Sequence, residues 1–185
     1  MASTERQNRK SNRLREYDYQ QPGWYYVTIC TYRGTCLFGE IDSGCVIHSP
    51  FGAVAVDSWL AIPEHFGTAE IDHFVVMPNH IHGILGFGGP SMGQGHVGAT
   101  HASPLRPKGP LSGSLGAVTG SFQSACSRIV NRMRGTPGAP VWQRNYYDHI
   151  VRDDQDLNRI RQYIRDNPLR WDLDDEHPSR RGVDE

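Results

Sequence analysis

Two largely apolar runs, residues 71–77 and 80–87, are separated only by Pro78 and Asn79. Both runs are rich in β-branched and aromatic side chains, which are typical of strands. Proline and asparagine are common in tight turns, where proline restricts the backbone and asparagine tolerates turn geometry. The sequence therefore predicts a tight antiparallel hairpin, and with it an antiparallel sheet.

Strands and helices are expected on both sides of this hairpin. Runs of β-branched and aromatic residues predict strands over residues 25–31, 36–47 and 141–151, of which the second is weaker and interrupted by glycines. Helical spacing of apolar residues predicts helices over residues 51–66, 115–133 and 153–167. This order is an α+β pattern, and we expect a ferredoxin-like antiparallel sheet with helices packed on one face.

A length of 185 residues fits one domain with room for an extra segment. We expect a basic N-terminal arm over residues 1–20, a single domain over 21–171 with a flexible Gly/Pro/Ser-rich loop at 88–110, and a disordered charged tail over 172–185. No apolar run approaches the ~18 residues of a membrane span, and no apolar segment follows the basic N-terminus. The expected location is the cytoplasm.

Two histidines stand out on the second strand of the predicted hairpin. Because side chains alternate along a strand, His80 and His82 project from one face while Ile81 points to the other. Two imidazoles on one face can hold a metal ion or face a phosphate. The alternative is two surface histidines in a chain that has nine. A metal site also needs a third ligand from another part of the chain.

The helix expected at 153–167 carries two further candidates. Tyr163 and Asn167 are four residues apart, so they lie one turn apart on the same side of a helix. A phenol and an amide oxygen so placed could face one metal-bound phosphate. The alternatives are a half-buried packing tyrosine and an asparagine that ends the helix before Pro168.

Charge is unevenly distributed along the chain. The totals of 20 acidic and 19 basic side chains argue against a nucleic-acid-binding protein. Between residues 73 and 147, however, there are six basic groups and no acidic one, as expected of a segment that faces an anion. The excess of arginine over lysine fits phosphate contacts, although a GC-rich genome explains it equally well. The six basic residues are Arg106, Lys108, Arg128, Arg132, Arg134 and Arg144.

One combination of motifs resembles a known family. The segment 71–84 reads IDHFVVMPNHIHGI, and the sequence YIRDNP follows at 163–168. Together they resemble the signature of the HUH single-tyrosine transposases and, within these, the REP-associated tyrosine transposases, which act on repetitive extragenic palindromes. An HxH pair alone is weak evidence, whereas MPNHIHG followed about 80 residues later by YIxxNP is highly specific. The resemblance extends over most of the chain.

The resemblance implies a metal-dependent endonuclease and strand transferase for single-stranded DNA in the bacterial cytoplasm, associated with the nucleoid. Its partners would be hairpins formed by REP-like palindromes, with no membrane involved. His80 and His82 match the family's histidine pair, Tyr163 its nucleophile and Asn167 its third ligand. The family's metal is Mg²⁺ or Mn²⁺, and cleavage leaves a covalent 5′-phosphotyrosine. A monomer is favoured, although some members of the superfamily are dimers.

Two other functions fit the residues alone. One is a non-catalytic module that binds hairpin nucleic acid, in which the histidines have no role. The other is a zinc-dependent hydrolase built on His80 and His82, which the absence of a carboxylate ligand nearby in the sequence disfavours.

Contacts with DNA are expected from basic and aromatic side chains outside the catalytic set. We predict that these are Arg13, Arg15, Arg128, Arg132, Arg144 and Tyr147. Trp142 and Tyr146 either stack on bases or pack within the fold. Candidates for a general base are Asp148 and His149.

Overall fold

The computed structural model describes residues 22–88 and 113–180. The predicted basic arm with Arg13 and Arg15 therefore lies outside the described residues. So do Arg106, Lys108 and all of the predicted 88–110 loop except its first residue.

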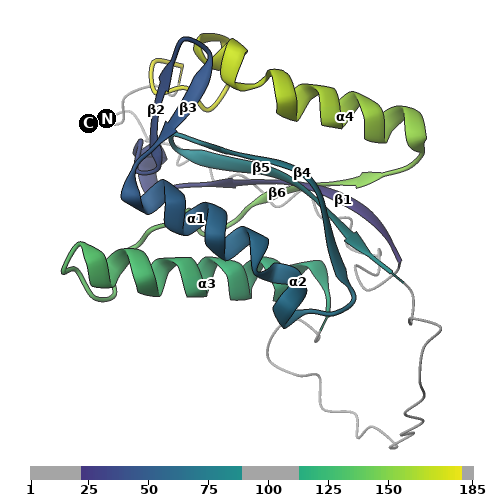
Figure 1. Ribbon diagram of the computed structural model, residues 1–185, viewed down its shortest axis with the longest axis horizontal. Helices are drawn as coiled ribbons and strands as arrows, with labels where there is room; N and C mark the ends of the chain where they lie inside the picture. The colour runs from purple at the N-terminus through teal and green to yellow at the C-terminus, as the bar shows by residue number, and fades with distance from the viewer. Residues whose placement is uncertain (1–21, 89–112, 181–185) are drawn as a thin grey trace, which may run out of the picture.

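A four-stranded antiparallel sheet forms the centre of the fold (Figure 1). Its strands lie in the order β4-β5-β1-β6, with bounds Ala69–Met77 (β4), His80–Phe87 (β5), Gly23–Cys30 (β1) and Tyr147–Val151 (β6). The predicted hairpin is present as β4 and β5, in which Met77 pairs with His80. The α+β class and the ferredoxin-like strand order are thereby confirmed.

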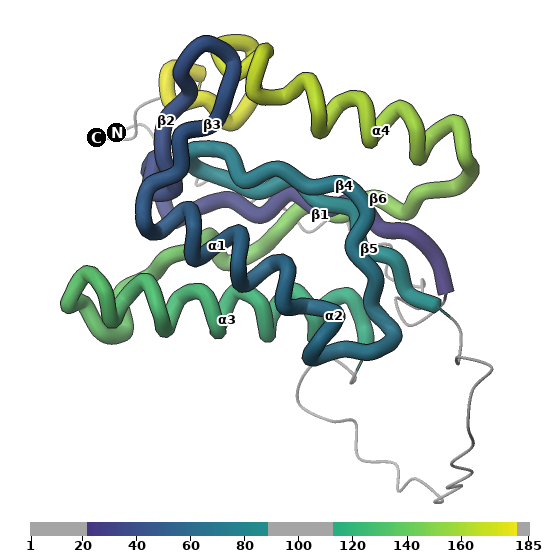
Figure 2. The backbone as a smooth tube through the Cα atoms, viewed as in Figure 1, coloured from purple at the N-terminus to yellow at the C-terminus, as the bar shows by residue number. Residues whose placement is uncertain are grey.

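Helices α1 (Pro50–Leu60) and α3 (Leu115–Met133) cover one face of the sheet, with the short α2 (Ile62–His65) following α1 (Figures 1 and 2). Trp59 of α1 is fully buried in this core. Its indole lies so close to β5 that a Cβ at Gly83 would come within 2.2 Å of the ring. The glycine after His82 is thus explained by packing, because any side chain there would displace Trp59.

Helix α4 (Asp154–Asp166) lies on the opposite face of the sheet (Figure 1). Its apolar side, formed by Leu157, Ile160 and Ile164, packs on Tyr26 and Ile84. The expectation of helices on one face holds for α1 and α3, and α4 adds a second layer on the other face. The reason is that β5 is buried along its entire length, so its apolar residues require cover on both sides.

The remaining elements connect or extend this core. They are η1 (Tyr32–Gly34), the hairpin β2 (Gly39–Asp42) and β3 (Cys45–His48), and η2 (Pro168–Leu173). The strand predicted at 141–151 begins only at Tyr147, as β6. Before it, Trp142 forms an isolated β-bridge with Thr31. Within the described residues, no helix is long and apolar enough to cross a membrane.

The chain remains ordered beyond residue 171. Asp174 and Glu176 are each only 7% exposed, and the Glu176 backbone carbonyl accepts a hydrogen bond from the Asn79 side chain at 2.7 Å. The predicted disordered tail is therefore wrong for residues 172–180. A run rich in acidic residues suggested solvation, but here it folds back over the end of the sheet.

An ion pair fastens α4 to the sheet. The guanidinium of Arg161 donates to the Asp72 carboxylate of β4, with Nε at 2.8 Å from Oδ2. Burial alone would raise the pKa of Asp72, but hydrogen bonds from Arg161 and His73 outweigh it and hold this pKa below its usual value.

Removing the carboxylate is expected to destabilise the protein at neutral pH. We expect Asp72→Asn to lower the free energy of unfolding by about 1–2 kcal/mol at pH 7. Because the pKa of Asp72 is lowered by folding, the stabilisation is complete above the ordinary pKa of about 4 and is lost as pH falls through the folded-state value. Urea unfolding of both proteins from pH 7 to pH 3 measures this. A destabilisation that does not shrink with acid would contradict it.

Candidate functional site

His80 and His82 lie on the face of β5 that α4 covers. They are 0% and 2% exposed, so they are not surface histidines. Their Nε2 atoms face each other at 2.9 Å. Two imidazole nitrogens at this separation can bind one cation, since ligands with bonds of about 2.1 Å stand about 3 Å apart.

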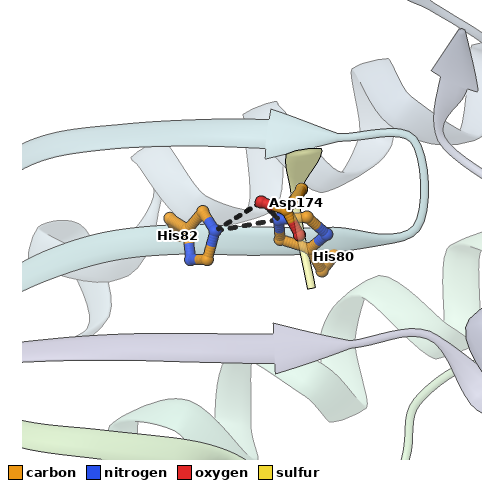
Figure 3. Close-up of side chains that lie close together, drawn as sticks. All are labelled: His80, His82 and Asp174. Carbon is orange, nitrogen blue, oxygen red and sulfur yellow. Dashed lines mark hydrogen bonds and ion pairs between the residues drawn. The ribbon is translucent and has the colours of Figure 1, made fainter. Parts of the chain in front are cut away.

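A carboxylate completes this group (Figure 3). Oδ2 of Asp174 lies 4.0 Å from the Nε2 of His80 and 3.9 Å from that of His82. All three side chains are buried, and their potential ligand atoms lie within 4.8 Å of one another. Asp174 comes from the segment after η2, which lies within the predicted tail. Zinc was disfavoured because the sequence has no carboxylate near the histidines. In the folded protein Asp174 is such a carboxylate, so this argument against zinc does not hold.

Neighbouring groups fix the Asp174 carboxylate. Its Oδ2 accepts from the Asn167 side-chain nitrogen and its Oδ1 from the Glu176 backbone N–H, each at 2.7 Å. Burial would raise the pKa of Asp174, but contacts with His82, His80 and Asn167 outweigh burial and lower it. Burial also lowers the pKa of His82, which Asp174 only partly opposes. At neutral pH the site is therefore a carboxylate beside a neutral imidazole, which suits a divalent cation.

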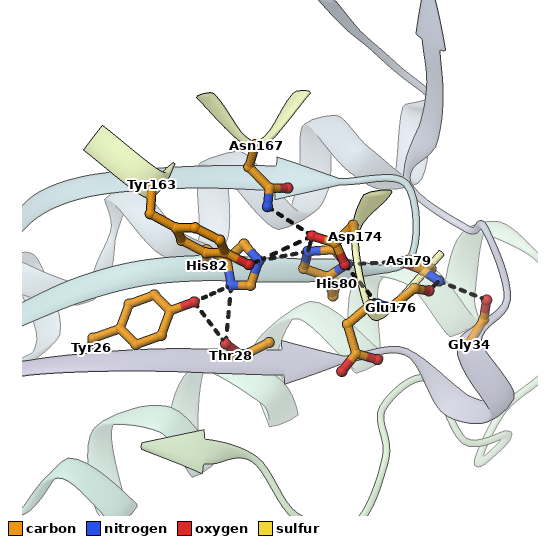
Figure 4. A network of polar contacts seen from close by, with 10 residues as sticks. All are labelled: Tyr26, Thr28, Gly34, Asn79, His80, His82, Tyr163, Asn167, Asp174 and Glu176. Carbon is orange, nitrogen blue, oxygen red and sulfur yellow. Dashed lines mark hydrogen bonds and ion pairs between the residues drawn. The ribbon is translucent and has the colours of Figure 1, made fainter. Parts of the chain in front are cut away.

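Asn167 lies beside the predicted metal site with its amide nitrogen toward Asp174 (Figure 4). Its oxygen is buried and has no hydrogen-bond partner among the described residues. In this orientation Asn167 holds the carboxylate, and Asp174 offers the third ligand atom. An amide rotation would exchange the two ends, so Asn167 stays a predicted ligand.

Hydrogen bonds on the far side of each ring orient the histidines. The Asn79 nitrogen donates to the backbone carbonyls of Gly34 and Glu176, so its oxygen is the acceptor for His80 Nδ1 at 2.8 Å. His80 therefore carries its proton on Nδ1 and presents a lone pair at Nε2. Outer-shell partners of this kind are typical of histidines that bind metals.

His82 has a different pair of outer partners. Its Nδ1 lies 2.7 Å from the Tyr26 hydroxyl and 3.0 Å from the Thr28 hydroxyl, both on β1. Because either hydroxyl can donate or accept, they do not by themselves fix the tautomer of His82.

Tyr163 projects from α4 toward the histidines. Its hydroxyl lies 3.4 Å from the Nε2 of His82, and the side chain is 47% exposed, so it faces both the site and solvent. Partial burial, followed by the charges of Asp174 and Asp175, raises the pKa of Tyr163 to about 12. At neutral pH the phenol is protonated, and a cation beside Asp174 would offset part of this effect.

The predicted DNA-contact residues are spread over two faces. Arg128 and Arg132 are exposed on α3, across the sheet from Tyr163, and Arg144 is exposed before β6. Tyr147 is 43% exposed and lies on the same face as the site, with its ring centroid 6.2 Å from that of Tyr26. Among the described residues that are predicted to contact DNA, Tyr147 therefore lies on the same face of the sheet as Tyr163.

Other candidates have structural partners. The indole nitrogen of Trp142 donates to the Gln123 carbonyl at 3.1 Å, which supports packing over base stacking. His149 Nε2 lies 2.7 Å from the Asp156 carboxylate. Asp148 pairs with Val27 in the sheet and so points to the α1/α3 face, away from Tyr163.

Sequence reasoning did not single out four residues of this site: Tyr26, Thr28, Asn79 and Asp174. Tyr26 and Thr28 do have a signal, because they lie two residues apart on a strand and so share a face. Asp174 has one too, since Leu169, Trp171 and Leu173 are large apolar residues in and beside the charged segment that contains it.

Comparison with known proteins gives three findings. A protein of Haemophilus influenzae, itself uncharacterised, is 33% identical over 167 residues, which are 90% of this chain and 92% of that protein. The solved structure of a REP-associated tyrosine transposase bound to a REP hairpin matches with a TM-score of 0.57 and 16% identity, over 88% of this chain and 74% of that one. No protein-family model matches the chain.

A further solved structure, described as that of a proposed transposase from Deinococcus radiodurans, matches with a TM-score of 0.46 and 16% identity. It covers 82% of this chain and 94% of its own.

Proposed function

The chain belongs to one family with the Haemophilus influenzae protein and has the fold of the REP-associated tyrosine transposase, and on this premise we propose that it cleaves and rejoins single-stranded DNA. The substrates would be hairpins formed by REP-like palindromes. The reaction would depend on a divalent metal and pass through a covalent 5′-phosphotyrosine.

One observation carries the proposal. Tyr163 is half exposed, and its hydroxyl lies 3.4 Å from the Nε2 of His82 and thus beside a buried His-His-Asp group. A tyrosine with a merely structural role has no need of such neighbours, whereas a nucleophile needs its target phosphate held next to a positive charge.

His80, His82 and Asp174 would hold the cation, with Asn167 orienting Asp174. The cation, when bound, supplies Lewis-acid stabilisation of charge on the scissile phosphate. We propose Mg²⁺ or Mn²⁺, as in the family that the motifs resemble.

Tyr163 is the attacking group. Its oxygen forms a bond to phosphorus, the bond from phosphorus to the 3′ oxygen breaks, and a 3′-hydroxyl leaves. The phenol proton is lost and the leaving oxygen gains one. Because the phosphodiester is retained as a tyrosine ester, the 3′-hydroxyl of another strand can reverse the step without ATP.

One chain supplies all of the described ligand candidates and the proposed nucleophile: His80 and His82 come from β5, Tyr163 from α4, and Asp174 from the segment after η2. This supports a monomer as the active form. We propose that Tyr147 stacks on a base next to the cleaved phosphate, since it is exposed on the same face. Arg13, Arg15, Arg128, Arg132 and Arg144 remain proposed phosphate contacts.

The test uses hairpin oligonucleotides with unpaired flanks, taken from palindromes beside the gene. We expect full-length protein and labelled DNA to form an adduct that resists denaturation in Mg²⁺ or Mn²⁺, and none in EDTA. Binding without an adduct across the whole panel would overturn the enzyme in favour of a hairpin-binding module. Cleavage with Zn²⁺ but without an adduct would instead indicate a hydrolase.

A further inference from the structure

Asn79 lies in the turn between β4 and β5, directly before His80, and is 0% exposed. Its amide nitrogen donates to two backbone carbonyls, that of Gly34 in η1 at 3.1 Å and that of Glu176 at 2.7 Å. Its amide oxygen lies 2.8 Å from the Nδ1 of His80 (Figure 4). One buried side chain thus joins the hairpin to two segments that are far from it in the sequence.

The orientation of the Asn79 amide follows from these partners. A backbone carbonyl can only accept a hydrogen bond, so the end of the amide that faces Gly34 and Glu176 is the NH2 group. The reverse orientation would place the amide oxygen against two carbonyl oxygens in a buried position, which is costly. Because its donors and its oxygen all have partners, this buried amide holds its neighbours in one arrangement.

A second hydrogen bond extends this connection to the candidate metal site. The backbone N–H of Glu176 donates to Oδ1 of Asp174 at 2.7 Å, while the carbonyl of the same residue accepts from Asn79. Glu176 therefore links the turn before His80 to the carboxylate that lies 4.0 Å from the Nε2 of His80.

The position of Asp174 needs such a link. Asp174 follows η2 and belongs to no strand, so pairing within the sheet does not fix it beside β5. The binding of a metal ion depends on ligands held at fixed positions, and the residues behind the ligands commonly change metal affinity 10- to 100-fold. Asparagine suits this place in the turn because its short side chain offers two donors and an acceptor.

We propose that Asn79 is a positioning residue for the metal site, and that it holds the segment bearing Asp174 against the strand bearing His80 and His82. This role rests on the metal site of the proposed function, but it requires neither DNA nor the reaction of Tyr163.

The metal affinity of the full chain without DNA tests this role. We expect Asn79→Ala to weaken Mn²⁺ binding about 10-fold, as measured by calorimetry. Asn131→Ala is the matched control, because Asn131 of α3 is also buried and its amide nitrogen donates to the Ala139 carbonyl at 2.8 Å. Both substitutions should lower thermal stability, whereas only Asn79→Ala should lower metal affinity. An equal loss of affinity in Asn131→Ala would overturn the proposal.

A double-mutant cycle tests whether Asn79 acts through Asp174. In the Asp174→Asn protein, which already lacks the carboxylate, Asn79→Ala should weaken Mn²⁺ binding by less than about threefold. A further loss of about 10-fold would mean that the two residues act independently, and would overturn the proposal.

The visible absorption of bound Co²⁺ gives a spectroscopic signature, because it depends on the number and type of the ligands. We expect the spectrum of Asn79→Ala to shift toward that of Asp174→Asn, and Asn131→Ala to keep the wild-type spectrum. An unshifted spectrum in Asn79→Ala would overturn the proposal.

Asn79→Ser is a smaller change that serves if Asn79→Ala does not fold, and it should weaken Mn²⁺ binding in the same direction. A wild-type chain that binds Mn²⁺, with folded Asn79 variants that bind it equally well, would overturn the positioning role alone. A wild-type chain that binds no Mn²⁺ would overturn the metal site, and with it this role.

Discussion

Tyr163→Phe is expected to abolish the covalent protein–DNA adduct, with a loss of at least about 1,000-fold in cleavage. The substitution removes the hydroxyl oxygen through which Tyr163 would form the phosphate ester. It leaves the aromatic ring, which in the wild-type protein packs against His82 with ring centroids 5.2 Å apart. The side chain is half exposed, so stability should change little. The measurement is adduct formation on a hairpin oligonucleotide in Mn²⁺, with binding followed by electrophoretic shift.

Binding of the hairpin should survive this change, because phosphate contacts from basic residues do not involve the Tyr163 hydroxyl. Tyr32→Phe is the matched control, since it loses a hydroxyl from an exposed tyrosine away from the site, and we expect it to form the adduct normally. An adduct that persists in Tyr163→Phe would refute this tyrosine as the nucleophile.

Asp174→Asn should weaken Mg²⁺ or Mn²⁺ binding by about 100-fold. The substitution keeps the shape of the side chain but removes the carboxylate that lies beside the two imidazoles. Calorimetry of the DNA-free protein measures the affinity. Asn167→Ala should have a smaller effect, about 10-fold, because Asn167 acts on the site by holding Asp174.

Asp175→Asn is the control for charge alone. Asp175 is adjacent in sequence but exposed, and it is absent from the buried ligand group. We expect its substitution to leave metal affinity within about twofold, since exposed charges are screened by solvent. If Asn167→Ala instead abolished binding while Asp174→Asn had little effect, Asn167 would be the third ligand.

Much of the fold is predictable from the sequence, because the hairpin, α3 and α4 have strong local signals. The side of the sheet that α4 covers is not, since periodicity shows which face of a helix is apolar but not which layer it joins. The isoleucines of β5 did contain that information, because Ile81 and Ile84 lie on opposite faces of the strand. A strand buried on both faces needs a layer on each side.

The site was predictable in part. His80, His82 and Tyr163 stand out by motif, and the fold brings them together. Asp174 was missed because a carboxylate in a charged segment looks solvated, and only its burial against the histidines distinguishes it from Asp175. Likewise, sequence alone could not show that Arg128 and Arg132 lie across the sheet from Tyr163.

In the proposed reaction, Tyr163 itself becomes joined to DNA. The most direct measurement is peptide mass spectrometry of the protein after incubation with hairpin DNA and Mn²⁺, followed by nuclease digestion. The predicted result is a 5′-phosphonucleotide on the peptide that contains Tyr163, at that residue. An adduct on a different side chain, or cut DNA with no modified peptide, would contradict it.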